Sequence, residues 1–285
     1  MPKLALIADD EKLAKAYWHS WYCTASIAEY ADGTISAWYC KRRWCPVCNA
    51  IRTAQVISRL TPVFDSWNER YFVTLTQGTT VTGEALRPTI AAMQQNFTRC
   101  KDRGKKRSQR KDGAKFVGIR KLEVTYNVRD NRFHPHYHAL LNSEETAQNL
   151  MMDWLSLNPG ASPNAQHVTP ANNGSLVELS KYMTKLTATD SKGNRQIYVD
   201  GLHTMFQALN GVRTLQTFGF TLPAIKEATG EAKAVDPIGK YQWISQLSDW
   251  GDMETGELLS GYVPSEAMKQ VIDSIVVSPN YNQYG

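Results

Sequence analysis

The pattern of apolar and polar residues predicts several strands in the middle of the chain. Residues 119–126 alternate between apolar and polar side chains, and residues 71–76 are mostly β-branched or aromatic, as is typical of strands. A third strand should begin at Pro135 or His136 and run to Leu141, because proline cannot donate a hydrogen bond within a sheet. Since only a short polar segment separates residues 119–126 from the third strand, the two should pair as an antiparallel hairpin.

Apolar residues at helical spacing predict the remaining elements. One helix should follow the turn at Gly83, and its apolar stripe includes Cys100, which we therefore interpret as a core residue. A helix that begins near Pro46 should end at Leu60, because the residue before Pro62 is pushed out of the helical region. We also expect helices at residues 143–157, 175–186 and 202–209, a strand at residues 212–218, and a hairpin that pairs residues 241–244 with residues 258–262.

Four of the five cysteines form a group near the start of the chain. They are Cys23, Cys40, Cys45 and Cys48. The first two flank an Asp32-Gly33 turn between strand-like segments, and the last two form a Cys-x-x-Cys turn. This arrangement predicts a structural zinc site with four sulfur ligands, because disulfides are disfavoured in a reducing cytosol and a redox pair would not need the first two cysteines. A closed shell would order the segment Arg42–Trp44 rather than perform chemistry.

Three of the six histidines recur at every second position of one predicted strand. Side chains alternate between the faces of a strand, so His134, His136 and His138 should project to the same side. Imidazoles in this arrangement can hold one metal ion, with His136 and His138 as the better pair and His134 at the edge. The alternative is a half-buried strand that presents histidines to solvent.

A carboxylate should lie beside these imidazoles. If the turn centres near residues 130 and 131, Glu123 lies opposite His138 and Thr125 lies opposite His136 on the same face. Glu123 and His134 are therefore both candidates for the third metal ligand, while the alternative for Glu123 is an ordinary polar position.

The helix expected at residues 175–186 has an apolar stripe and an opposite polar stripe. The polar stripe presents Glu178, Tyr182 and Lys185 together. A tyrosine can attack phosphorus when a metal polarises the phosphate, and a nearby lysine favours the phenolate. Taken alone, these residues are also consistent with a solvated helix face.

Positive charge is concentrated in one segment. The formal net charge is +5, whereas residues 101–115 contain eight basic and two acidic residues, a local charge of +6. We expect this segment to be a loop that contacts phosphates, although a solvated loop is the alternative. Its candidate DNA-binding residues are Lys105, Lys106, Arg107, Arg110 and Lys111. No apolar run is long enough to span a membrane and the first residues do not resemble a signal peptide, so a cytoplasmic protein is expected.

Taken in order, these motifs resemble the HUH endonuclease superfamily, and among its members the rolling-circle plasmid replication initiators with one catalytic tyrosine and an upstream glutamate. The resemblance covers Cys23 to Gly219 and rests on the cysteine cluster, the strand 72–76, His134-Pro135-His136-Tyr137-His138, and Glu178-x-x-x-Tyr182-x-x-Lys185. It implies an α+β fold in which a central antiparallel sheet is flanked by helices, with the zinc-binding hairpin at the N-terminus. We expect a zinc-binding subdomain at residues 1–60, an endonuclease core at 61–220, and an extension of unknown role at 221–285.

The resemblance also implies an activity. A divalent ion, Mn²⁺ or Mg²⁺, would be held at the histidines, and Tyr182 would nick single-stranded or hairpin origin DNA through a 5′-phosphotyrosine intermediate. Glu178 would then serve as general base for a second, hydrolytic cleavage, with Lys185 assisting the tyrosine. Arg42, Arg43 and Trp44 would contact the origin, and a host helicase and DNA polymerase would be partners.

Two alternatives to this activity remain. One is a zinc-ribbon DNA-binding regulator that performs no chemistry, and the other is an HUH relaxase or transposase.

Overall fold

The computed structural model describes residues 1–78, 80–110, 113–180, 188–189, 195–223, 236–244, 249–261 and 275–276. The chain forms two compact units, one made of Met1–Ile51 and Lys226–Ile275, the other of Arg52–Ile225 and Val276–Gly285. The predicted boundaries at residues 60 and 220 stay a prediction.

The first unit combines two helices with a small antiparallel sheet. Its elements are α1 (Pro2–Leu6), α2 (Glu11–Trp21), β1 (Ser26–Glu29), β2 (Ile35–Ala37), β10 (Gly239–Ile244) and β11 (Asp249–Asp252), and the strand order is β11-β10-β1-β2. The β1–β2 hairpin confirms the predicted Asp-Gly turn, since Gly33 has φ +79° and Asp32 Oδ1 accepts the Thr34 N–H at 2.9 Å.

The C-terminal hairpin was predicted with the wrong partner. Strand β10 pairs with β11 on one side and with β1 on the other, and residues 258–260 of the predicted segment lie beside β11 instead, through a bridge between Leu258 and Gly251 and hydrogen bonds to Trp250 and Asp249. The β1–β10 pairing joins segments more than two hundred residues apart, which no local pattern reveals.

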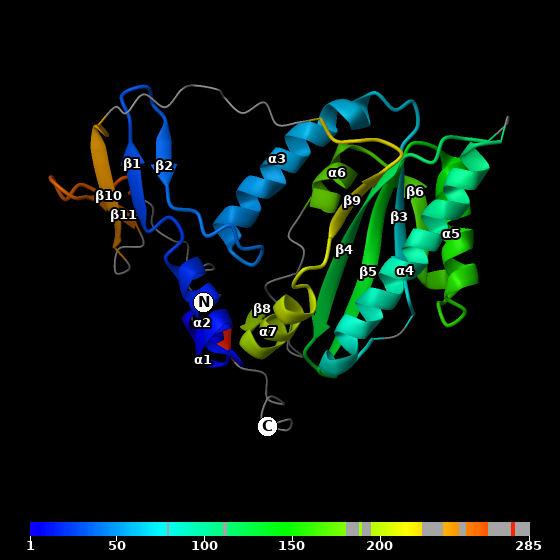
Figure 1. Ribbon diagram of the computed structural model, residues 1–285, viewed down its shortest axis with the longest axis horizontal. Helices are drawn as coiled ribbons and strands as arrows, with labels where there is room; N and C mark the ends of the chain where they lie inside the picture. Colours follow the sequence, from blue (N-terminus) through cyan, green and yellow to red (C-terminus); the bar gives the residue numbers. More distant parts are fainter. Residues whose placement is uncertain are drawn as a thin grey trace. The chain divides into compact units, whose positions relative to one another are not determined.

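The second unit is built around a five-stranded antiparallel sheet (Figure 1). Its strand order is β6 (His167–Pro170), β3 (Tyr71–Thr76), β5 (Arg132–Leu141), β4 (Gly118–Asn127), β9 (Leu215–Phe218). The other elements are α4 (Gly83–Ser108), α5 (Glu144–Leu157), the short 3₁₀ turn Pro163–Ala165, α6 (Asn173–Ser180), β7 (Ala188–Thr189), β8 (Arg195–Tyr198) and α7 (Val199–Ala208), while α3 (Pro46–Asp65) contributes residues to both units and β12 spans Ile275–Val276. The predicted α+β class with a central antiparallel sheet is confirmed.

Different helices cover the two faces of this sheet (Figure 1). On one face, the buried ring of Tyr137 in β5 contacts Phe97 of α4 and Trp154 of α5. On the other face, a core cluster joins the two helices α3 and α6 to the central strands. Its members are Leu60, Phe64, Ile119, Leu140, Leu176 and Leu179. The histidine strand β5 therefore lies at the centre of the sheet, with helices on both sides.

Helix α3 does not end before Pro62 as predicted but continues to Asp65. Leu60 and Phe64 flank the proline and are both 2% exposed in the core. Their burial outweighs the one backbone hydrogen bond that proline removes.

The basic segment is only partly the loop that was predicted, because α4 extends to Ser108, while residues 113–115 have no regular secondary structure. Arg103 and Arg107 both bind Asp153 of α5, which ties the end of α4 to its neighbour. Lysine and arginine are good helix formers, and positive charge in a last turn is favourable with the helix dipole. A charge run that suggested a loop is therefore a helix end with a specific partner.

None of the helices in the described part of the chain is long and apolar enough to cross a membrane.

Candidate metal centre and nucleic-acid contacts

The hairpin of β4 and β5 sets which residues face each other. Asn127 lies opposite Arg132, so Glu123 lies opposite His136 and Lys121 lies opposite His138. The predicted register, with Glu123 opposite His138, is wrong by two residues. Because side chains alternate with a period of two, this shift keeps Glu123 on the histidine face.

The turn explains the register. The Asn127 side chain forms two hydrogen bonds within the turn. Its Oδ1 accepts the Arg129 N–H at 3.0 Å, and its Nδ2 donates to Asp130 Oδ2 at 2.8 Å. Asn131 has φ +47°, a left-handed conformation that asparagine tolerates better than most residues. The loop therefore centres one residue earlier than the sequence suggested.

Glu123, His136 and His138 come together as a possible metal site. One ligand atom from each lies within 4.8 Å of the other two, and Glu123 Oε2 is 3.9 Å from His138 Nε2. The ring of His134 stacks on that of His136 at 5.2 Å, but His134 is not part of this group. Among the described residues, the structure thus offers Glu123 as the third ligand.

Hydrogen bonds orient both imidazoles, and the one at His136 leaves its Nε2 available. The Nδ1 of His136 lies 3.1 Å from the backbone carbonyl of His134, and a carbonyl only accepts, so this nitrogen carries the proton. The Nδ1 of His138 lies 3.2 Å from the hydroxyl of Thr74 on β3. Such outer contacts orient metal ligands in proteins. Thr74 is visible in the sequence only as a polar strand position.

Burial keeps His136 neutral. Burial, together with the nearby His138, lowers the pKa of His136 to about 4, so at neutral pH its Nε2 keeps a lone pair. Burial also lowers the pKa of His134. Imidazole nitrogens with one carboxylate oxygen suit manganese or a softer divalent ion better than magnesium, which prefers oxygen ligands.

Lys121 adds a buried cation that the sequence analysis treated only as a polar strand position. Its Nζ lies 3.5 Å from Glu123 Oε2, and the two residues are 3% and 5% exposed. It therefore supplies positive charge beside the carboxylate on the face that carries the histidines.

Helix α6 packs on this same face. Its Leu176 and Leu179 are buried against Leu140, which follows His138 by two residues on β5 and so shares its face. Glu178 lies on α6 and is partly exposed, while Tyr182 and Lys185 lie outside the described residues. Helix α6 therefore lies on the face of the sheet that carries the histidines.

The four N-terminal cysteines also form a group suited to a metal. Cys23 Sγ and Cys40 Sγ lie 3.5 and 3.7 Å from Cys48 Sγ, and all four sulfurs, including that of Cys45, lie within 4.8 Å of one another. A tetrahedron with zinc–sulfur bonds of 2.3 Å has edges of about 3.8 Å. The Cys40 N–H donates to Cys23 Sγ and the Lys41 N–H to Cys48 Sγ, as expected for sulfurs that carry negative charge. The donor set therefore fits a structural zinc ion.

The aromatic residue predicted to contact DNA also packs within the first unit, and its contact with DNA stays a prediction. Trp44 donates from Nε1 to Ser20 Oγ at 2.8 Å, and its ring lies 5.2 Å from that of Tyr17. Arg42 and Arg43 remain exposed. Five other large aromatic residues of this unit are exposed and were missed by the sequence analysis: Trp18, Trp21, Tyr22, Trp38 and Tyr39.

The predicted DNA-binding residues of the basic segment differ in their surroundings. Lys105, Lys106 and Arg110 are exposed, whereas Arg107 forms its ion pair with Asp153. Lys111 lies outside the described residues.

Comparison with known proteins gives a consistent picture. Residues 34–149 match a family described as "Replication protein". Three curated relatives are called "Protein rep". That of Streptococcus pneumoniae is 30% identical over 120 residues (39% of this chain, 35% of that protein), that of Staphylococcus aureus 26% over 187 residues (57% and 79%), and that of Bacillus amyloliquefaciens 32% over 111 residues (37% and 31%). The match thus spans about a third of the first and third relatives and most of the second. No solved structure matches the chain significantly.

Proposed function

We propose that this chain nicks and rejoins single-stranded DNA at a replication origin, a proposal supported by the match of residues 34–149 to the replication protein family and by the curated relatives. The observation that carries the proposal is the group Glu123, His136 and His138 on the central strands, with α6 packed on the same face. A divalent ion held by these three residues would bind a nonbridging oxygen of the scissile phosphate and stabilise its developing charge.

Two side chains carry out the cleavage step beside the metal ion. The Tyr182 oxygen attacks phosphorus and the bond to the 3′ oxygen breaks, which leaves a 5′-phosphotyrosine and, once that oxygen takes a proton, a free 3′-OH. Lys185 favours the phenolate by charge. Rejoining reverses the same step, so it needs no nucleotide.

Glu178 is assigned to the hydrolytic step that ends the reaction. It lies four residues before Tyr182, which on the helix expected at residues 175–186 would be about one turn away and within reach of the same phosphate. As a general base it removes a proton from water, which hydrolyses a second scissile bond instead of forming a second ester. The product strand is then released. A host helicase would open the duplex and a polymerase would extend the 3′-OH.

The test uses the full-length, zinc-loaded protein with Mn²⁺ and a labelled library of single-stranded oligonucleotides. We expect a covalent adduct that is lost in Tyr182→Phe and retained in Tyr71→Phe, the matched control on β3. Glu178→Ala should still nick but should lose hydrolytic release. If the parent protein binds DNA but forms no covalent adduct with it, whichever divalent ion is present, the result would instead favour a zinc-ribbon regulator.

A relaxase or transposase is a nearer alternative with the same bond chemistry. The presence of Glu178, rather than a second tyrosine, before Tyr182 favours an initiator whose reaction ends by hydrolysis. Release of a hydrolysed product after one round would support this distinction, and two successive adducts would contradict it.

A further inference from the structure

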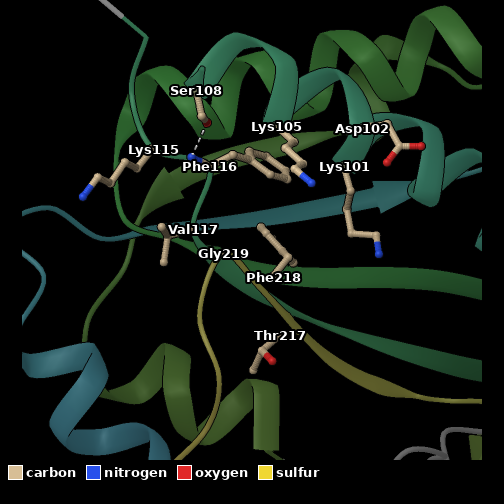
Figure 2. Close-up of a pocket in the computed structure, with 10 residues that line it drawn as sticks. All are labelled: Lys101, Asp102, Lys105, Ser108, Lys115, Phe116, Val117, Thr217, Phe218 and Gly219. Carbon is tan, nitrogen blue, oxygen red and sulfur yellow. Dashed lines mark hydrogen bonds between the residues drawn. The ribbon is translucent and has the colours of Figure 1, made fainter. Parts of the chain in front are cut away.

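A cavity of about 490 Å³ lies at the β9 edge of the large sheet (Figure 2). Its walls are the C-terminal half of α4, the segment that leads into β4, and the end of β9. Lys101 and Lys105 extend from α4 on one side, and Lys115 lies on the other side. We call this cavity the lysine pocket, defined by these three residues.

Four basic residues in the C-terminal half of α4 form two stripes with different roles. Arg103 and Arg107 are one turn apart and both bind Asp153 of α5. Lys101 and Lys105 are also one turn apart, but at about 100° per residue they lie on the opposite side of the helix, which faces the pocket. The first stripe holds the fold together, and the second is available for a ligand.

The helix dipole does not account for this second stripe. A cation in the last turn of a helix is favourable, which suffices to explain Lys105. Lys101 lies two turns from the end of α4, where this effect has faded, and Lys115 belongs to a different segment. The helix dipole therefore does not explain why three lysines from two segments line one cavity.

The charges around the pocket are not balanced. Asp102 is the single carboxylate among the lining residues, so the lining carries a formal charge of +2 (three lysines minus one aspartate). In the part of the chain that the structure describes, no ion pair within 4 Å involves these lysines. Burial lowers the pKa of Lys101, and the nearby Arg120 and Arg213 lower it further, while Asp102 opposes them. An anion in the pocket would relieve this repulsion.

The apolar part of the pocket is preformed. Phe116 and Phe218 stack at 4.7 Å and are both largely buried. A Cβ on Gly104 would come within 2.6 Å of the Phe116 ring, so this ring is packed directly against α4. Ser108 Oγ accepts the Phe116 N–H at 2.8 Å, which fixes the segment before β4 (Figure 2). The amines thus project from a rigid frame, which reduces the ordering cost of binding.

We propose that the lysine pocket binds a phosphate group of the DNA strand, as an anchor separate from the metal centre. This inference rests on the proposed function for the identity of the ligand. The pocket lies on the α4 side of the sheet, where Phe218 contacts Phe97, whereas Glu123 and the histidines lie on the other side. A strand bound at both sites would pass around the β9 edge of the sheet, so the pocket would hold a phosphate several nucleotides away from the one that is cleaved.

The test compares Lys101→Ala/Lys105→Ala with Arg99→Ala in the full chain. Arg99 is the matched control, because it is an exposed basic residue on the same helix and does not line the pocket. Binding to single-stranded and hairpin oligonucleotides is measured over a range of salt. Each lost phosphate contact reduces the magnitude of the slope of log K against log salt by about 0.7 to 0.9. We expect the double variant to lose about 1 in slope and about tenfold in affinity, with Arg99→Ala close to the parent.

Three further arms make the result decisive. Lys101→Arg/Lys105→Arg should restore the slope, which separates charge from packing. Inorganic phosphate and pyrophosphate should compete only weakly; tight binding of either, with DNA binding unchanged in the alanine variant, would make the pocket a site for a free anion and overturn the proposal. Equal effects of Arg99→Ala and the double variant would also overturn it. Formation of the Tyr182 adduct at saturating DNA should persist in the double variant, whereas its absence in the parent would indicate failure of the proposed function instead.

Discussion

Replacing Thr74 with valine should weaken metal binding without removing a ligand. The change keeps the shape of the side chain but removes the hydroxyl that lies 3.2 Å from Nδ1 of His138. Loss of such an outer hydrogen bond costs about 10- to 100-fold in metal affinity, or about 1.4 to 2.7 kcal/mol. Because Thr74 is partly exposed, water can replace part of the contact, and we expect the lower end, about tenfold.

The affinity is measured by titrating Mn²⁺ into the zinc-loaded protein and following the loss of the free-ion paramagnetic resonance signal. Thr74→Ser should bind like the parent because it retains the hydroxyl. Thr98→Val on α4 is the control, since the Thr98 hydroxyl contacts only the Gln94 carbonyl of its own helix. If Thr74→Val binds manganese as tightly as Thr98→Val does, Thr74 does not orient the ligand and the metal site is assembled differently.

Three further predictions address the remaining parts of the molecule. Cys45→Ser should abolish the binding of one zinc ion per chain and expose the N-terminal unit to proteolysis, while the large sheet still unfolds cooperatively. A variant that keeps one zinc ion would contradict the four-sulfur site. Unfolded histidine binds a proton near pH 6.5 and folded His136 near 4, so the free energy of unfolding should fall as the pH drops from 6.5 towards 4, by at most about 1.4 kcal/mol per pH unit. Denaturant titrations of His136→Asn should show a shallower dependence of this free energy on pH. Trp21→Ala and Trp38→Ala, whose rings are 48% and 52% exposed, should each weaken binding of single-stranded DNA by about 1 to 3 kcal/mol, and fluorescence titrations that show unchanged affinity would exclude base stacking there.

The sequence predicted the parts of the fold that depend on local periodicity. The strand at residues 71–76, the buried stripe of α4 with Cys100, and the helix expected at residues 143–157 are all present. The same periodicity put Glu123 on the face of His136 even though the register was wrong, because a shift of two residues does not change the face.

The errors come from tertiary contacts that no local pattern contains. Helix α3 passes Pro62 because residues on both sides are buried, and the end of α4 is helical because Asp153 of another helix binds its arginines. The orienting role of Thr74 was hidden for a similar reason, since β3 meets β5 only in the folded sheet. The contact of Trp44 with DNA stays a prediction, and its hydrogen bond to Ser20 shows that this side chain also packs within the first unit.

The most direct test of the metal's role replaces a nonbridging oxygen of the scissile phosphate with sulfur. If the ion at Glu123, His136 and His138 contacts that atom, sulfur should slow nicking with Mg²⁺ by at least tenfold, and Mn²⁺, which tolerates sulfur better, should restore it. Restoration should be absent in His136→Ala. An equal effect of sulfur with both ions, or restoration that persists in His136→Ala, would show that the cation held by these residues does not act on the phosphate that is cleaved.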